Sequence, residues 1–145
     1  MHNCFLRFRY IIFPNGIILI LFESTANVII KGKVMEITVT PYECCDLVVV
    51  SGRIDSYTAP KLSETLNNIT KNNRYNIILD LSDVIYVSSA GLRVFIDIQK
   101  TCKRLNKGEV ILVNIPQRVY ETLELAGFAP LFTFYQNVKS AIDSF

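Results

Sequence analysis

A chain of 145 residues with half of its positions apolar is long enough for one domain with a hydrophobic core and too short for two. Residues 1–35 carry four Lys or Arg against one Glu, a net charge of +3, whereas residues 36–145 carry eleven Lys or Arg against twelve Asp or Glu, a net charge of −1. A domain of that charge lacks the basic surface that binds a phosphate backbone, so we expect no nucleic-acid partner.

The first 34 residues differ in composition from the rest of the chain. Arg7 and Arg9 precede an apolar stretch, but its uninterrupted run, Ile17–Phe22, is far shorter than the roughly 20 residues of a membrane-spanning helix. No small-residue cleavage site follows closely, as a signal peptide would require. Because Met35 directly precedes the first expected strand, we interpret residues 1–34 as a leader of uncertain status, disordered or non-native, with translation beginning at Met35. We expect no stable membrane association.

Two strands and a helix are predicted at the start of the domain, which we assign to residues 36–145. Residues 36–40 alternate polar and apolar side chains, and 46–53 form a β-branched run beyond Pro41. Thr58 is a polar cap two residues before Pro60, as at a helix start. Apolar residues then recur at helical spacing. They are Leu62, Leu66 and Ile69.

A central strand and a long helix follow. Residues 75–81 form an apolar strand of the kind that is buried on both faces, with Asp80 at its carboxyl end. Ser88 and Ser89 precede a helix whose last turn is cationic and which Gly108 terminates. Its largely apolar stripe indicates one face packed on the core. The stripe comprises Leu92, Phe95, Ile96, Gln99, Cys102 and Leu105.

The last third of the chain continues the alternation of strands and helices. Residues 109–113 predict a buried strand, and Pro116 opens a helix that Gly127 ends. Residues 131–135 and 137–145 predict a final strand and a final helix. The alternation predicts an α/β domain with a small mixed β-sheet flanked by helices.

The cysteines do not suggest a disulfide or a metal site. They stand at positions 4, 44, 45 and 102, and neighbouring cysteines cannot easily form a disulfide of ordinary geometry. Zinc sites need spaced pairs of Cys and His, and the only histidine is His2. We therefore expect free thiols in a reducing cytoplasm, no bound metal and no cofactor.

The start of the long helix carries the functional signal. Residues 79–94 read LDLSDVIYVSSAGLRV, with two hydroxyls, a small residue and a glycine at the helix start. The free N–H groups and positive dipole end there favour an anion, so a phosphoryl group on a serine would be tolerated. Gly91 would leave room for the backbone of a partner. An ordinary capping serine explains the same spacing, so the pattern alone leaves both interpretations open.

The segment VIYVSSAGLRV resembles the signature of STAS domains, the family of bacterial anti-sigma factor antagonists and related regulators. The segment 51–60 (SGRIDSYTAP) resembles the family's strand-turn-helix entry, Ile78–Leu81 its central strand, and Leu125–Phe128 its late helix end. The resemblance covers residues 36–145. It implies a single STAS-like domain with a small mixed sheet.

The usual family signature at this helix start is Asp-Ser-Ser/Thr-Gly-Leu-Gly. With the glycine matched to Gly91, Ser88 replaces the aspartate and Ser89 takes the first hydroxyl position. Ala90 replaces the second hydroxyl, and Arg93 replaces the last glycine. The resemblance therefore implies phosphorylation at Ser89, with Ser88 as the alternative.

The function implied by the resemblance is partner switching. The unphosphorylated domain would bind a serine-kinase anti-sigma factor and release a sigma factor, the kinase would inactivate it at Ser89, and a phosphatase would restore it. Added charge inside an interface imposes repulsion and desolvation that a neutral hydroxyl does not. We expect the partner-binding surface to comprise Asp55, Thr58, Ser88, Ala90, Gly91 and Arg93.

Two other function classes fit the sequence less well. An enzyme with Ser89 as nucleophile is not expected, because residues 36–145 contain no histidine base and no Ser-x-x-Lys arrangement surrounds Ser89. The stronger alternative is a STAS docking subunit of a transporter or signalling complex that is never phosphorylated. Paired hydroxyls at the helix start oppose it only weakly, since serine is also a good cap.

Overall fold

The computed structural model describes residues 10–12, 18–20, 34–104 and 108–145. Most of the predicted leader lies outside the described residues, apart from two short strands that pair with each other. In chain order the elements are β1 (Tyr10–Ile12), β2 (Ile18–Ile20), β3 (Glu36–Pro41), β4 (Asp46–Ile54), α1 (Ala59–Lys71), β5 (Ile77–Val87), α2 (Ser89–Arg104), β6 (Val110–Val113), α3 (Gln117–Leu125), the 3₁₀ helix η1 (Ala129–Leu131), β7 (Thr133–Tyr135) and α4 (Val138–Asp143).

The main sheet has five strands in the order β3-β4-β5-β6-β7. β3 and β4 form an antiparallel hairpin, whereas β4 to β7 run parallel to one another. The parallel strands need crossover connections, which α1, α2 and α3 provide. The expected α/β domain with a mixed sheet is therefore confirmed.

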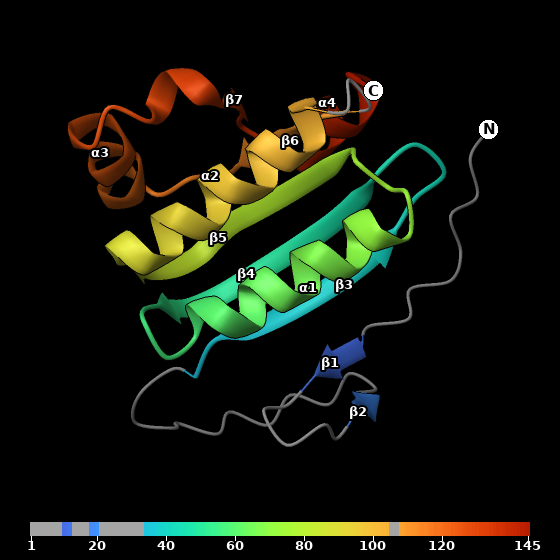
Figure 1. Ribbon diagram of the computed structural model, residues 1–145, viewed down its shortest axis with the longest axis horizontal. Helices are drawn as coiled ribbons and strands as arrows, with labels where there is room; N and C mark the ends of the chain where they lie inside the picture. Colours follow the sequence, from blue (N-terminus) through green and yellow to red (C-terminus); the bar gives the residue numbers. More distant parts are fainter. Residues whose placement is uncertain (1–9, 13–17, 21–33, 105–107) are drawn as a thin grey trace.

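The sheet is buried on both faces because its central strands are apolar at consecutive positions. On β5, Ile77 and Leu79 belong to the larger core, while Ile78 belongs to a second, smaller one. Helices α1, α2 and α3 contribute apolar residues to the larger core, and α4 contributes Ala141 to the smaller one. In Figure 1, α1 and α2 lie side by side across one face of the sheet.

Two predicted boundaries are wrong. Asp80 does not end the central strand, because β5 continues to Val87 and pairs with β4 along nearly its whole length, with two register shifts. The final strand starts at Thr133, because Ala129–Leu131 form the 3₁₀ helix η1. The extension of β5 matters for function, since it carries the chain directly to the two serines.

None of the helices in the described ranges combines the length and the apolar character that crossing a membrane requires.

Candidate functional site

The ends of β4 and β5 bring the expected site residues together. The two strands run parallel, and their register places Ile54 beside Val87. The Ser88 N–H donates a hydrogen bond of 2.8 Å to the Ile54 carbonyl. The turn that follows β4 and the start of α2 therefore lie next to each other, although more than 30 residues separate them in the chain.

Ser88 is the N-cap of α2. Its hydroxyl oxygen accepts a hydrogen bond of 3.3 Å from the Gly91 N–H, and its carbonyl accepts one of 2.9 Å from the Leu92 N–H. The residue is half-buried. Its side chain therefore satisfies one of the backbone donors that the helix start leaves free.

Ser89 is the first residue of α2, and it is exposed. Among the residues that the structure describes, none forms a hydrogen bond with its hydroxyl. The positive end of the helix dipole lies at the same place, where an added anion is stabilised. Of the two adjacent serines, Ser89 is the one whose hydroxyl is available to another protein.

The turn after β4 is held by Asp55. Its carboxylate accepts hydrogen bonds from the Tyr57 N–H at 2.9 Å and the Thr58 N–H at 3.2 Å. These bonds, led by the one from Tyr57, hold the pKa of Asp55 below its usual value, and the charge of Arg53 acts in the same direction. Asp55 therefore carries its negative charge and fixes the turn beside the start of α2.

Thr58 has a different role from the one that the sequence indicated. Its hydroxyl does not cap α1; it donates to the Arg53 carbonyl at 2.8 Å and accepts from the Asp55 N–H, also at 2.8 Å. The predicted N-cap position of Thr58 is confirmed, but its side chain does not cap the helix, because these two backbone groups of the turn already engage the hydroxyl. Thr58 closes the turn and is half-buried there.

The packing inside the domain requires a glycine at position 91. It is buried, and a Cβ at this position would lie 2.6 Å from Ile54 Cγ2 and 2.9 Å from Val87 Cγ1. The space left by its missing side chain is therefore filled by the ends of β4 and β5. Ala90 is half-buried and packs against the same core, whereas Arg93 is exposed one helical turn after Ser89.

Sequence reasoning missed a set of exposed aromatic and apolar side chains beside the site. Tyr57, in the turn after β4, is 92% exposed, and on β5 Ile85 is 52% and Tyr86 is 44% exposed. The guanidinium of Arg53 stacks over the Tyr86 ring at 4.6 Å from its centroid, a cation–π contact. Aromatic and Arg side chains are enriched where proteins bind one another. For Ile85 and Tyr86, the available signal was two large side chains in sequence between the apolar residues Val84 and Val87, which are buried.

Three kinds of chemical group lie together at this surface. In the described ranges, no three side chains of the types that bind metals gather at one place. The surface offers an exposed hydroxyl at a helix start, an ionised carboxylate in a rigid turn and an exposed cation.

The sequence of this chain matches a known protein family. The model of the STAS domain matches residues 37–141. The chain belongs to the STAS domain family. A curated relative, the anti-sigma-B factor antagonist of Listeria monocytogenes, is 31% identical over 96 residues, which cover 66% of this chain and 82% of that protein. The curated proteins of this family that match are anti-sigma factor antagonists, which are regulatory binding proteins.

Solved STAS domains share the fold. An anti-sigma factor antagonist from Mycobacterium paratuberculosis superimposes with a TM-score of 0.69 at 22% identity, over 77% of this chain and 93% of that one. The phosphorylated form of the Bacillus cell fate determinant SpoIIAA gives 0.61 at 13% identity, over 74% and 97%. The murine anion transporter Slc26a9 gives 0.60 at 16%, over 72% of this chain and 18% of the transporter. At these identities the likeness shows the fold alone.

Proposed function

We propose that this chain is a cytoplasmic anti-sigma factor antagonist whose unphosphorylated form binds a serine-kinase anti-sigma factor and thereby releases a sigma factor. Phosphorylation of Ser89 by that kinase switches the domain off, and a phosphatase restores it. The observation that carries the proposal is the division of labour between the two serines. Ser88 is engaged as the N-cap of α2, while Ser89 is exposed with its hydroxyl available.

The position of Ser89 allows a phosphate without disrupting the fold. A phosphoserine carries about −1.5 to −2 charges, and the first turn of a helix stabilises negative charge. Asp55 lies in the adjoining turn, where its ionised carboxylate opposes an added phosphate. We infer that phosphorylation acts mainly on the partner, because a dianion in the middle of an interface costs desolvation and repels acidic groups.

The binding surface combines the expected residues with those that the fold adds. Asp55 and Thr58 hold the turn, Ser88 and Ala90 shape the helix start, and Arg93 supplies a cation on the polar side of α2. Gly91 supports this surface from within, since the ends of β4 and β5 fill the space beside it.

Binding of a purified serine-kinase anti-sigma factor by isothermal titration tests the proposal. Ser89→Ala should bind as the unmodified chain does, and Ser89→Asp should bind at least tenfold more weakly while remaining folded. Ser140→Asp is the matched control, because Ser140 is an exposed serine in the first turn of α4, on the opposite face of the sheet. Equal affinity of Ser89→Asp and Ser140→Asp would contradict the proposal.

Arg93 is tested in the same assay. Arg93→Glu should weaken binding, whereas Lys100→Glu, the same charge change at an exposed position two turns further along α2, should not. An unchanged affinity of Arg93→Glu would remove this residue from the interface.

The second candidate is a docking subunit of a transporter or signalling complex that is never phosphorylated. A segment with this fold also occurs in the anion transporter Slc26a9. The intact mass of the protein recovered from cells distinguishes the two. A fraction that is one phosphate heavier supports the switch, and a single unmodified species under every growth condition supports the docking subunit.

A further inference from the structure

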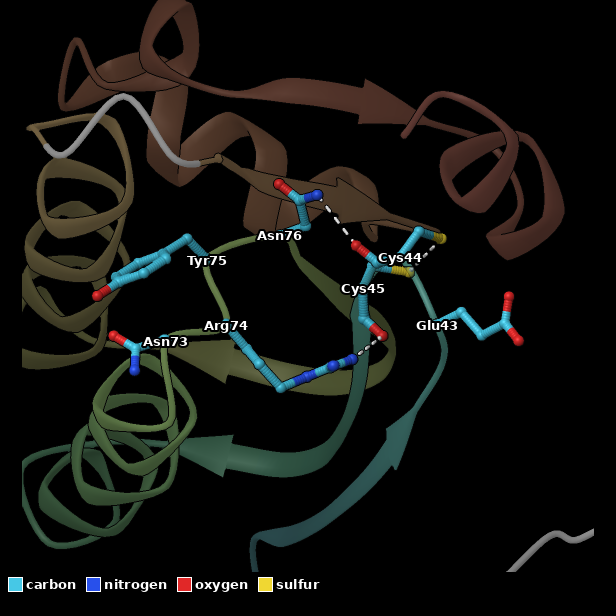
Figure 2. Close-up of a pocket in the computed structure, with 7 residues that line it drawn as sticks. All are labelled: Glu43, Cys44, Cys45, Asn73, Arg74, Tyr75 and Asn76. Carbon is cyan, nitrogen blue, oxygen red and sulfur yellow. Dashed lines mark hydrogen bonds between the residues drawn. The ribbon is translucent and has the colours of Figure 1, made fainter.

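The turn between β3 and β4 holds two adjacent free thiols. It lies at the opposite end of β4 from the serines, since β4 begins at Asp46 and ends at Ile54. The Cys44 and Cys45 Sγ atoms are 3.7 Å apart, and Figure 2 shows them pointing toward each other. Cys44 is exposed and Cys45 is buried, so the pair spans the boundary between surface and interior.

Hydrogen bonds to the backbone hold this turn in place. The Asn76 side-chain amide donates to the Cys44 carbonyl at 3.0 Å. The Cys45 carbonyl accepts from the Arg74 guanidinium at 3.0 Å and from the Tyr42 N–H at 2.8 Å. Because the carbonyls of both cysteines are anchored, the two thiols are held close together before any ligand arrives. Such preorganisation reduces the entropy lost on binding.

The spacing of the thiols is unsuited to a disulfide and suited to a shared ligand atom. The Cα atoms of adjacent residues lie about 3.8 Å apart, below the range of about 4.4–6.8 Å found in disulfides, and the sulfurs would have to close to about 2.05 Å. Arsenic(III) is three-coordinate and pyramidal, so its two thiolate sulfurs lie somewhat closer together than the roughly 3.8 Å of a tetrahedral zinc site. The observed separation of 3.7 Å is an ordinary contact between two thiols, and it closes by far less to hold such a centre than to form a disulfide.

We propose that Cys44 and Cys45 form a bidentate site for trivalent arsenic that carries one organic substituent. This class of ligand needs two thiols and no third protein ligand, and no group of three metal-binding side chains exists among the described residues. A cavity of about 220 Å³ adjoins the pair and offers room for the substituent. Its walls are formed by Glu43, Cys44, Cys45, Asn73, Arg74, Tyr75 and Asn76, as Figure 2 shows.

Capture is a condensation in two steps without a change of oxidation state. The exposed Cys44 thiol adds first to an arsenoxide, R–As=O, forming one As–S bond and an As–OH group. The Cys45 thiol then displaces that hydroxide, which leaves as water with the thiol proton, and the second As–S bond forms. Burial raises the pKa of Cys45 to about 12, so this thiol is a poor nucleophile on its own and the exposed neighbour must begin the reaction.

Titration with phenylarsine oxide in excess glutathione tests the site on the freshly reduced full chain, with intact mass as the readout. We expect one adduct per chain, heavier by one phenylarsine oxide less one water. Cys44→Ser and Cys45→Ala should each lower the apparent affinity at least tenfold, because a single As–S bond exchanges with glutathione. Cys4→Ser, the matched change at a thiol outside the described residues, should leave the affinity unchanged. Asn76→Ala, which releases the Cys44 carbonyl, should weaken binding several-fold.

Three results would overturn this assignment. They are full adduct formation by Cys44→Ser, loss of the adduct in Cys4→Ser, and conversion of the reduced pair to a disulfide in place of arsenical uptake. If Cys45→Ala does not fold by circular dichroism, Cys44→Ser still decides, since that side chain is exposed. The site is independent of Ser89, so either proposal can fail while the other stands.

Discussion

Replacing Gly91 by alanine should destabilise the domain, although alanine is the better helix former. The new Cβ would lie 2.6 Å from Ile54 Cγ2 and 2.9 Å from Val87 Cγ1, and both of these side chains are buried. Overpacking of this kind costs about 1–3 kcal/mol, against a gain in helix propensity of at most about 1 kcal/mol. Taking about 2 kcal/mol for the overpacking and about 1 kcal/mol for the propensity, the expected net loss is about 1 kcal/mol. For a domain of this size such a loss lowers the melting temperature by about 4 °C.

Thermal unfolding followed by circular dichroism measures this effect, with Ser89→Ala as the matched control two residues earlier in the same helix turn. The packing argument also predicts that Gly91→Ala and Ile54→Ala are less than additive, because the second change removes the atom that the new Cβ meets. An unchanged or raised melting temperature for Gly91→Ala would refute the reasoning. Loss of partner binding at unchanged stability would support the view that Gly91 makes room for a partner.

Three further predictions follow from the hydrogen bonds and the ion pair. Ser88→Ala should cost about 1 kcal/mol in chemical denaturation and Ser89→Ala almost nothing, because only Ser88 caps α2; equal losses would contradict the assignment. Arg74→Met should lower the free energy of unfolding by about 3 kcal/mol in the same assay, because Asp46, whose side chain is 4% exposed, loses its charged partner. Adding Asp46→Asn should recover part of that loss, and no recovery would contradict the pairing. The pKa of Asp55 lies below its ordinary 3.8, so the stability that its carboxylate gives the fold is present above pH 3.8 and is lost as the pH falls further. The difference in melting temperature between the unmodified chain and Asp55→Ala should therefore narrow below pH 3.8. A constant difference would contradict this role of Asp55.

The fold was predictable where apolar periodicity was strong. Helix α2 begins at Ser89, within one residue of the start that the two serines indicated, and β6 occupies most of the predicted strand 109–113. The strand through residues 82–87 was missed because Ser82 and Asp83 interrupt the apolar run, while the hydrogen bonds to β4 that sustain it come from a distant segment. Pairing partners of that kind leave no local signal.

The site was predictable in position but not in the roles of its residues. The motif placed Ser88 and Ser89 at a helix start, yet only the hydrogen bond to the Gly91 N–H distinguishes the cap from the exposed hydroxyl. The internal role of Gly91 depends on Ile54, which is far away in the chain. Contacts through space assign these roles, and a short motif does not contain them.

Mapping the phosphorylated residue tests the central proposal most directly. The full chain is incubated with its serine-kinase anti-sigma factor and Mg-ATP, and the modified peptide is sequenced by tandem mass spectrometry, with Ser88→Ala and Ser89→Ala in parallel. We predict one phosphate, on Ser89, which Ser88→Ala retains and Ser89→Ala loses. Phosphate on Ser88 would contradict the assignment of the two serines, and an unmodified chain would contradict the switch.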